Sequence, residues 1–372
     1  MPAKSVYLIS PAYRRWLTPD FTDLEFELEG FDPKDATPWQ ADVLVRDLDS
    51  DAETRSVTSI EGTPKTFTIP APKFHRRAEI VLYFQDRRTK EPACEGRWKL
   101  TNISKEELGS LSYFDSRGVF FHEGQGRFPL VLASAATGPE GWKAIAEAGF
   151  TGVAPDAKLI DDEAAKLAAS LKLLLFPVLA RLPPEAIVKE VGRLQGFSAV
   201  AGYCGLVKND SPNVIRKADS SRPTIALSPF TVSGDDLHES FAEFQDVIML
   251  NDDWTGKYRA GPASCRRSGR AHFAYVDVAS ANFLSSLYAA AAKGASGVLA
   301  SSNEPFALNA IAGKLKESGP LVNTVVRGVP ERSDDASADR WFWRRRLGPN
   351  EKAVIEVKRG DPPSATFTVT RE

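Results

Sequence analysis

The sequence predicts three consecutive parts: a β-sandwich, a (β/α)8 barrel of the TIM type, and a small C-terminal β element. Short β-rich runs bounded by Pro, Asp and Gly fill the N-terminal region, which is typical of a sandwich. Further along, apolar runs alternate with amphipathic segments, which indicates β/α units. We therefore expect the sandwich over residues 1–114, the barrel over 115–330 and the β element over 331–372.

Six β-rich runs predict the strands of the first domain. They are SVYLIS, LEFELEG, ADVLVRDL, KTFTIP, AEIVLYF and GRWKL. The stretch FDPKDATPW predicts a turn-rich connector, and RTKEPACEG predicts a hairpin loop. No helical period competes with these strands.

Eight apolar runs, seven of them followed by a helical pattern, predict the barrel strands. They are FPLVLAS (128–134), FTGVAP (150–155), LLLFPVLA (173–180), SAVAGYCGL (198–206), PTIALSPF (223–230), DVIML (246–250), HFAYVDVA (272–279) and GVLASS (297–302). Strands that are apolar throughout are typical of parallel sheets covered on both faces. Eight units favour a (β/α)8 barrel over a doubly wound sheet, which usually has fewer strands. The sixth unit is irregular, because TGKYRAGPASCRRSGR stands where a helix is due.

The tail contains three further strand candidates, WFWRRR, AVIEVKRG and SATFTVTRE. They would suit pairing with the N-terminal domain or a small sheet of their own.

Composition narrows the class of function. The chain has 372 residues, of which 42% are hydrophobic and 26% charged, as in ordinary globular proteins. Its 47 Lys and Arg nearly balance 49 Asp and Glu, which argues against a nucleic-acid partner. The sequence contains no run of 18 apolar residues, so it predicts no membrane-spanning helix. The start MPAKSVYLIS lacks a signal-peptide pattern, so either the protein is cytoplasmic or a leader has been removed; compartment and oligomeric state stay open.

We expect neither a metal nor a cofactor. Cys94, Cys204 and Cys265 lie far apart without a CxxC pair, although one disulfide remains possible. The four histidines form no HxH or HExxH pattern, and no GxSxG, GxGxxG or GxxxxGK[ST] motif is present.

Several segments together resemble the skeleton of glycoside hydrolases that carry a β-sandwich before a catalytic barrel. These are SVYLISPAYR, GVFFHEGQGRFPLVLAS (118–134), GWKAIAEAGFTGVAP (141–155) and FLSSLYAAAAKGASGVLASS (283–302). The resemblance spans most of residues 5–320. It implies a carbohydrate substrate and a pair of catalytic carboxyl groups.

The chain departs from this pattern after the fourth barrel strand. Such hydrolases carry an acid/base carboxylate there, in a Trp-Tyr-x-x-Asp-Glu-Pro or Asn-Glu-Pro setting. Here AGYCGLVKNDSPN (201–213) places Lys208, Asn209 and Asp210 at the corresponding positions. Asp210 is the candidate for a displaced acid. After the seventh strand, where a nucleophile often lies, the candidate is Asp277 in AYVDVAS.

Glycoside hydrolysis needs two carboxyl groups, about 5–5.5 Å apart for retention or about 6.5–9.5 Å apart for inversion. Barrels supply them from the carboxyl ends of strands. The catalytic candidates are Asp277, Asp252, Asp210 and Asp253. The structural alternatives are a salt bridge for Asp277, a turn or helix cap for the Asp252-Asp253 pair, and a solvated loop acid for Asp210.

Substrate binding would use aromatic rings for stacking and polar side chains for hydrogen bonds near the same strand ends. The candidates are Trp254, Tyr203, Tyr258, Tyr275, Asp156, Lys208, Asn209, Asn251 and Glu304. Glu304, in SNEPF, also fits an ordinary helix start.

Two functions follow from these residues. The first is a glycoside hydrolase acting on an oligo- or polysaccharide. The second is a catalytically inactive relative that binds glycans or serves as a structural module, as the missing carboxylate pair after the fourth strand would suggest. The fold alone does not decide between them.

Overall fold

The computed structural model describes most of the chain. The described ranges are 3–11, 13–32, 34–115, 118–133, 138–179, 181–205, 211–230, 247–251, 271–292, 295–301, 308–309, 311–313, 315–316, 329–331, 340–348, 350–358 and 364–371. Contacts divide the chain into two compact units, one made by Met1–Gly109 and the other by Ser110–Ser264 with Ala271–Glu372. The finer division at residues 114 and 330 stays a prediction.

The first unit consists of two β-sheets that share one hydrophobic core. The three-stranded sheet has the order β1 (Ser5–Ser10), β3 (Asp23–Glu29), β6 (Thr66–Pro70). The five-stranded sheet has the order β2 (Trp16–Leu17), β8 (Pro92–Asn102), β7 (Arg77–Asp86), β4 (Trp39–Asp47), β5 (Glu53–Ile60). All pairs are antiparallel except β2 with β8. A short helix, α1 (Lys105–Leu108), follows and begins at a capping box made by Ser104 and Glu107.

Alternation along the strands explains this shared core. In β3, Leu24 and Phe26 are fully buried, while Glu25 between them and Glu27 after them are half-buried. The Phe26 ring stacks on Phe67 of the same sheet, at 5.3 Å between ring centroids, and Phe67 also contacts Phe84 of the other sheet. Large apolar side chains from both sheets therefore pack together, and such burial is the main stabilising term.

The second unit contains a parallel eight-stranded sheet with strands at all eight predicted positions. Its order is β14 (Leu174–Leu175), β13 (Gly152–Val153), β12 (Leu130–Leu132), β19 (Gly297–Ser301), β18 (Ala271–Asp277), β17 (Val247–Asn251), β16 (Thr224–Phe230), β15 (Tyr203–Gly205). Parallel bridges also join Leu175 of β14 to Val200, just before β15, and Cys204 of β15 to Val178, just after β14. Each of the two outermost strands of this order therefore pairs with a residue that adjoins the other.

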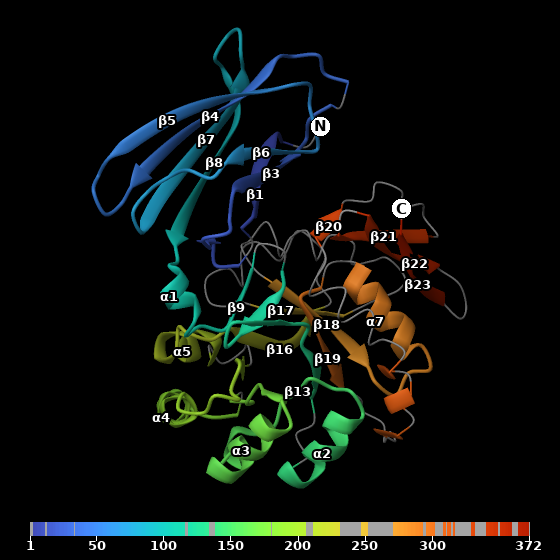
Figure 1. Ribbon diagram of the computed structural model, residues 1–372. Helices are drawn as coiled ribbons and strands as arrows, with labels where there is room; N and C mark the ends of the chain where they lie inside the picture. The colour runs from blue at the N-terminus through green and yellow to red at the C-terminus, as the bar shows by residue number, and fades with distance from the viewer. Residues whose placement is uncertain are drawn as a thin grey trace. The chain divides into compact units, whose positions relative to one another are not determined.

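Helices connect these strands and lie outside them (Figure 1). They are α2 (Pro139–Glu147), α3 (Asp162–Ser170), α4 (Pro184–Leu194), α5 (Ser211–Ala218) and α7 (Phe283–Ala292), with a 3-10 turn η1 (Ala157–Leu159). In α2, Pro139 stands in the first turn, Trp142 and Ile145 share the buried face, and Gly149 beyond its end adopts a φ of 101°. The predicted alternation of β and α elements and the parallel sheet are thus confirmed. The helical pattern after the fifth apolar run, PTIALSPF, and the irregular segment TGKYRAGPASCRRSGR lie outside the described residues.

The two faces of the parallel sheet carry different side chains. Ala274, Val276 and Val298 belong to the core that the helices share. The opposite face carries Phe273, whose ring lies 6.5 Å from that of Phe176. This second face is hereafter called the inner face. Glycines make room for its rings, because a Cβ at Gly297 would lie 2.6 Å from the Phe273 ring.

The described part of the second unit also contains two smaller sheets. One has the order β11 (Gln125–Arg127), β10 (Phe120–His122), β9 (Tyr113–Phe114), and its aromatic rings contact Phe176 and Phe273. The other is antiparallel, with the order β20 (Val329–Glu331), β21 (Arg340–Gly348), β22 (Glu351–Lys358), β23 (Ser364–Arg371), and it contacts α7. Of the two arrangements expected for the tail, the strands adopt a sheet of their own.

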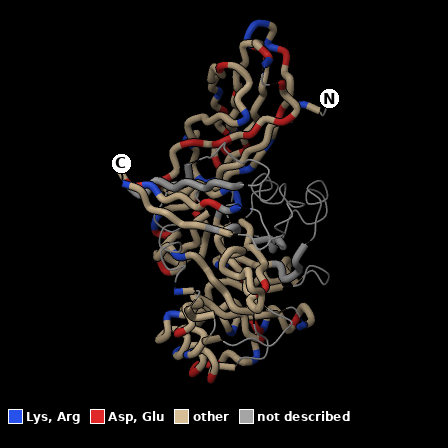
Figure 2. The backbone as a smooth tube through the Cα atoms, turned by 90° about the vertical axis from the view of Figure 1, so that its right-hand side faces the viewer, with Lys and Arg blue, Asp and Glu red and all other residues tan. Residues whose placement is uncertain are grey.

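Charged residues of both signs are interspersed along the described chain (Figure 2). None of the described helices is long and apolar enough to cross a membrane.

Candidate functional site

Strand β18 presents one carboxylate on the inner face, at its carboxyl end. Successive side chains of a strand point to opposite faces, so Phe273, Tyr275 and Asp277 share the inner face. Their exposure rises along the strand: Phe273 is fully buried, Tyr275 is half-buried and Asp277 is exposed. The sequence therefore brings an aromatic ring and a carboxylate together at the point where the strand ends.

The register places further polar residues level with these two. Asp277 pairs with Ser301 at the end of β19, and Tyr275 pairs with Asn251 at the end of β17. Paired residues of parallel strands share a face, so Ser301 also belongs to the inner face. Only the backbone of Asn251 is described. Ser301 was not among the predicted site residues, although its position at the end of the eighth apolar run, GVLASS, could have indicated it.

With the residues that the structure describes, the Asp277 carboxylate makes one local contact. Its Oδ1 accepts a hydrogen bond of 2.9 Å from the backbone N–H of Ala279, two residues along the chain. No basic side chain among the described residues forms an ion pair with Asp277. The second carboxylate oxygen thus stays available to a ligand, as far as the described part of the chain shows, and the salt-bridge alternative receives no support there.

Asp156 lies at the carboxyl end of another strand, β13. It is half-buried, it pairs with Val178, and its Oδ1 accepts a hydrogen bond of 3.0 Å from the backbone N–H of Lys158. That bond caps the 3-10 turn η1. The structure therefore gives Asp156 a local structural contact at the same edge of the sheet as Asp277.

Tyr203 lies away from the inner face. Its side chain is fully buried in the core shared with the helices, and its hydroxyl donates to Asp219 Oδ2 at 2.8 Å. Burial raises the pKa of the Tyr203 hydroxyl, and the neighbouring Asp219 charge raises it further. Since no ring face reaches the surface, Tyr203 is left out of the site proposed below.

Asp219 is itself the centre of a buried polar cluster. It accepts hydrogen bonds from the Ser221 hydroxyl at 2.6 Å and from Arg222 Nη1 at 2.9 Å. Burial alone would raise the pKa of Asp219, but the hydrogen bonds from Ser221 and Tyr203 and the Arg222 charge together lower it. Arg222 also donates to the carbonyl oxygens of Val200 and Gln195, so the cluster ties β15 to the end of α4.

The other predicted site residues lie outside the described residues. They are the catalytic candidates Asp210, Asp252 and Asp253 and the binding candidates Lys208, Asn209, Trp254, Tyr258 and Glu304. Their roles stay predictions, as does the distance between any two catalytic carboxyl groups.

Within the described ranges, no three His, Cys, Asp or Glu side chains come together in a way that could hold a metal ion. Cys94 and Cys204 are free thiols, and burial raises the pKa of both, that of Cys94 to about 12.

Comparison with known proteins gives a distant likeness in fold. No protein-family model matches the chain, and no curated protein matches it. A β-glucuronidase from Bacteroides uniformis aligns with all of this chain at 9% identity and a TM-score of 0.39. Two putative α-galactosidases from Bacteroides fragilis align with this chain at a TM-score of 0.43 each. The first alignment covers 95% of this chain and 86% of the α-galactosidase chain, at 11% sequence identity. The second covers 99% of this chain and 96% of the other α-galactosidase chain, at 10% sequence identity. This chain spans 62% of the length of the β-glucuronidase.

Proposed function

We propose that the chain is a carbohydrate-active hydrolase, built from a β-sandwich and a closed (β/α)8 barrel. β14 and β15 are the first and last strands of the sheet order. Closure of the barrel is supported by the parallel bridges that join these two strands to residues adjoining each other's ends, Leu175 to Val200 and Cys204 to Val178. Backbone hydrogen bonds run both ways between these segments: Leu175 receives one from Ala201 and donates one to Ala199. The sandwich is supported by the core that the two sheets of the first unit share.

The observation that carries the proposal is Asp277, exposed on the inner face at the carboxyl end of β18. In a (β/α)8 barrel the reacting groups stand at the carboxyl ends of strands, around the mouth. An ionised carboxylate there could attack an anomeric carbon or activate a water molecule. The half-buried ring of Tyr275 lies two residues before Asp277 on the same face of β18, where it could pack against a sugar.

The partner carboxyl group would come from Asp210, Asp252 or Asp253. Asp210 follows β15, and the other two follow β17, so all three stand after the carboxyl ends of strands in the same sheet. One carboxylic acid would protonate the leaving oxygen while Asp277 acts on the opposite side of the sugar. Trp254, Tyr258, Asn251, Lys208, Asn209, Glu304 and Asp156 are the proposed binding residues around this pair.

A catalytically inactive glycan-binding protein is the second candidate. It is favoured by one observation, that Asp156 and Asp277 each accept a hydrogen bond from the backbone two residues further on. Such contacts are common for acids that merely stabilise turns.

A substrate panel separates the two candidates. Aryl glycosides and polysaccharides would be incubated with the wild type, with Asp277→Asn and with Asp162→Asn, a control at an exposed acid in the first turn of α3. The hydrolase predicts turnover by the wild type and by Asp162→Asn, and loss of about a hundredfold or more in Asp277→Asn. Glycan binding without any turnover would instead establish the inactive protein.

A further inference from the structure

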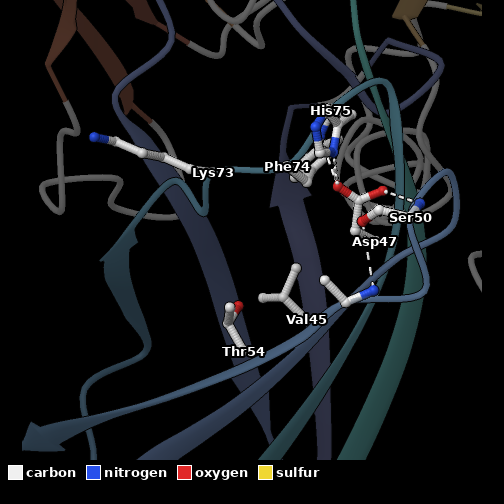
Figure 3. A pocket seen from close by; sticks show the side chains of 8 residues that line it. Val45, Asp47, Ser50, Thr54, Lys73, Phe74 and His75 are labelled. Carbon is white, nitrogen blue, oxygen red and sulfur yellow. Dashed lines mark hydrogen bonds and ion pairs between the residues drawn. The ribbon is translucent and has the colours of Figure 1, made fainter.

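A pocket in the first unit lies well apart in sequence from the residues of the proposed active site. Its volume is about 350 Å³, which is within the size range of small-molecule sites. One wall is the hairpin that joins β4 to β5, and the other is the segment that precedes β7 (Figure 3). All of its lining residues lie between positions 45 and 75, so the pocket belongs to the first unit alone.

The two walls are held together by one carboxylate, Asp47. Its Oδ1 accepts backbone hydrogen bonds from Asp49 at 2.9 Å and Ser50 at 3.2 Å, which close the hairpin turn. Its Oδ2 accepts from the backbone N–H of His75 at 2.8 Å and contacts the His75 ring Nδ1 at 2.6 Å. The pocket is therefore built before any ligand arrives, which lowers the entropic cost of binding.

The same contacts decide which hydrogen bonds His75 offers. The backbone hydrogen bond from His75, together with those from Asp49 and Ser50, lowers the pKa of Asp47 despite its burial, so this carboxylate only accepts. The ring Nδ1 must then donate to this carboxylate, which leaves Nε2 as the ring nitrogen that can meet a ligand. No described residue donates to that nitrogen in the structure.

The lining combines an apolar floor with polar groups at the rim. Val45 and Phe74 pack against the core of the unit and form the floor. Ser50 and Thr54 contribute hydroxyl groups, and Figure 3 shows Thr54 and Lys73 on the side of the floor away from Ser50. An apolar floor with a few polar groups around it suits a small ligand that has one apolar face and several hydroxyls.

Charge selects among such ligands. Lys73 is exposed and forms no ion pair with a described residue, and its flexible stem lets the ammonium reach a ligand at the rim. The acids of the hairpin already have partners. Asp47 accepts from backbone N–H groups and contacts the His75 ring. Asp49 pairs with Arg77 at 3.1 Å, and Asp51 lies 3.7 Å from Arg46. Among the described residues, Lys73 is thus the cationic side chain of the lining that has no acidic partner.

We propose that this pocket binds a small polyhydroxylated carboxylate, such as a hexuronate. Its carboxylate pairs with Lys73, its hydroxyls exchange hydrogen bonds with Thr54, Ser50 and His75 Nε2, and its C–H face packs on Phe74. A ligand of this size at a shallow site binds with a Kd of roughly millimolar. The inference does not depend on the proposed hydrolase, because the pocket shares no residue with it.

The test is calorimetric titration of the full-length protein with D-glucuronate and, separately, with D-glucose. The variants are Lys73→Met, which removes the charge but keeps most of the stem, and Ala52→Trp, which fills the pocket from an exposed position. Lys65→Met is the matched control, because Lys65 is also exposed but does not line the pocket.

We expect D-glucuronate to bind the wild type and Lys65→Met equally, Lys73→Met about five- to tenfold more weakly, and Ala52→Trp not measurably. D-glucose should bind the wild type at least about fivefold more weakly than D-glucuronate. Absence of D-glucuronate binding up to about 50 mM, equal affinity for D-glucose, or binding that survives Ala52→Trp or Lys73→Met would overturn the inference. Asp277→Asn should bind as the wild type does, so a negative result leaves the hydrolase proposal standing.

Discussion

Replacing Asp219 with alanine should destabilise the second unit severely. The side chain is 3% exposed and receives four hydrogen bonds, from the hydroxyls of Tyr203 and Ser221, the backbone of Ser221 and the guanidinium of Arg222. Without Asp219, the Arg222 guanidinium, which is 15% exposed, loses its ion pair with this carboxylate, and the Tyr203 hydroxyl loses its acceptor. Breaking a buried ion pair in this way costs about 3–5 kcal/mol. That is a large part of the ~5–15 kcal/mol by which proteins are stable.

The assay is urea unfolding of the full chain, with hydrogen exchange of the amides in β15 and α5 as the local measurement. Tyr203→Phe removes one hydrogen bond and should cost about 1 kcal/mol. Glu147→Ala is the matched control, because its pair with Lys143 spans 3.9 Å with both side chains more than half exposed, and it should cost about 0.5 kcal/mol or less. A cost below about 1 kcal/mol for Asp219→Ala would show that this carboxylate does not hold the cluster together.

Two glycines and one histidine give further predictions. A Cβ at Gly202 would lie 2.9 Å from a backbone oxygen, so Gly202→Ala should lower the free energy of unfolding by about 1–3 kcal/mol. A Cβ at Gly192, inside helix α4, would meet open space, so Gly192→Ala should raise that free energy by about 0.5–1 kcal/mol. The midpoints of urea unfolding measure both changes. His122 donates from Nε2 to the Ser198 carbonyl and accepts at Nδ1 from Ser112, and burial lowers its pKa. Because the unfolded chain protonates first, below about pH 6.5, stability should fall as the pH drops through this value. Unfolding free energies at pH 7.5 and 5 should therefore differ less in His122→Gln; an unchanged difference would contradict this.

The parallel strands could be predicted because both of their faces are covered. Runs such as HFAYVDVA are apolar at nearly every position, which marks them as buried strands without a helical period. The same property hides which residues share a face. Tyr203 was predicted at the mouth but faces the helices, since a shift of one residue along a strand reverses the face. Asp277 could be placed because it is the one charged residue in its run.

Edge strands and polar clusters could not be predicted, because no run of apolar residues in the sequence marks them. Strand β5 was not predicted, because seven of its eight residues are polar or exposed and its sequence, ETRSVTSI, shows no clear apolar alternation. The contact between Asp47 and His75 joins residues 28 positions apart in separate segments, so no local spacing indicates it. Asp219 directly follows α5, and no motif in the surrounding sequence marks it as the centre of a buried cluster. In each case the pattern is created by the packing of distant segments.

The central claim is that Asp277 acts at the carboxyl edge of the parallel sheet, and the most direct test is a kinetic comparison of two carboxylates at that edge. On the best substrate from the panel, kcat/KM would be measured for the wild type, Asp277→Asn and Asp156→Asn. We expect a loss of about a hundredfold or more in Asp277→Asn. We expect a smaller loss, about tenfold or less, in Asp156→Asn, whose side chain caps the turn η1. Turnover by Asp277→Asn at the wild-type rate would show that Asp277 is not a catalytic group.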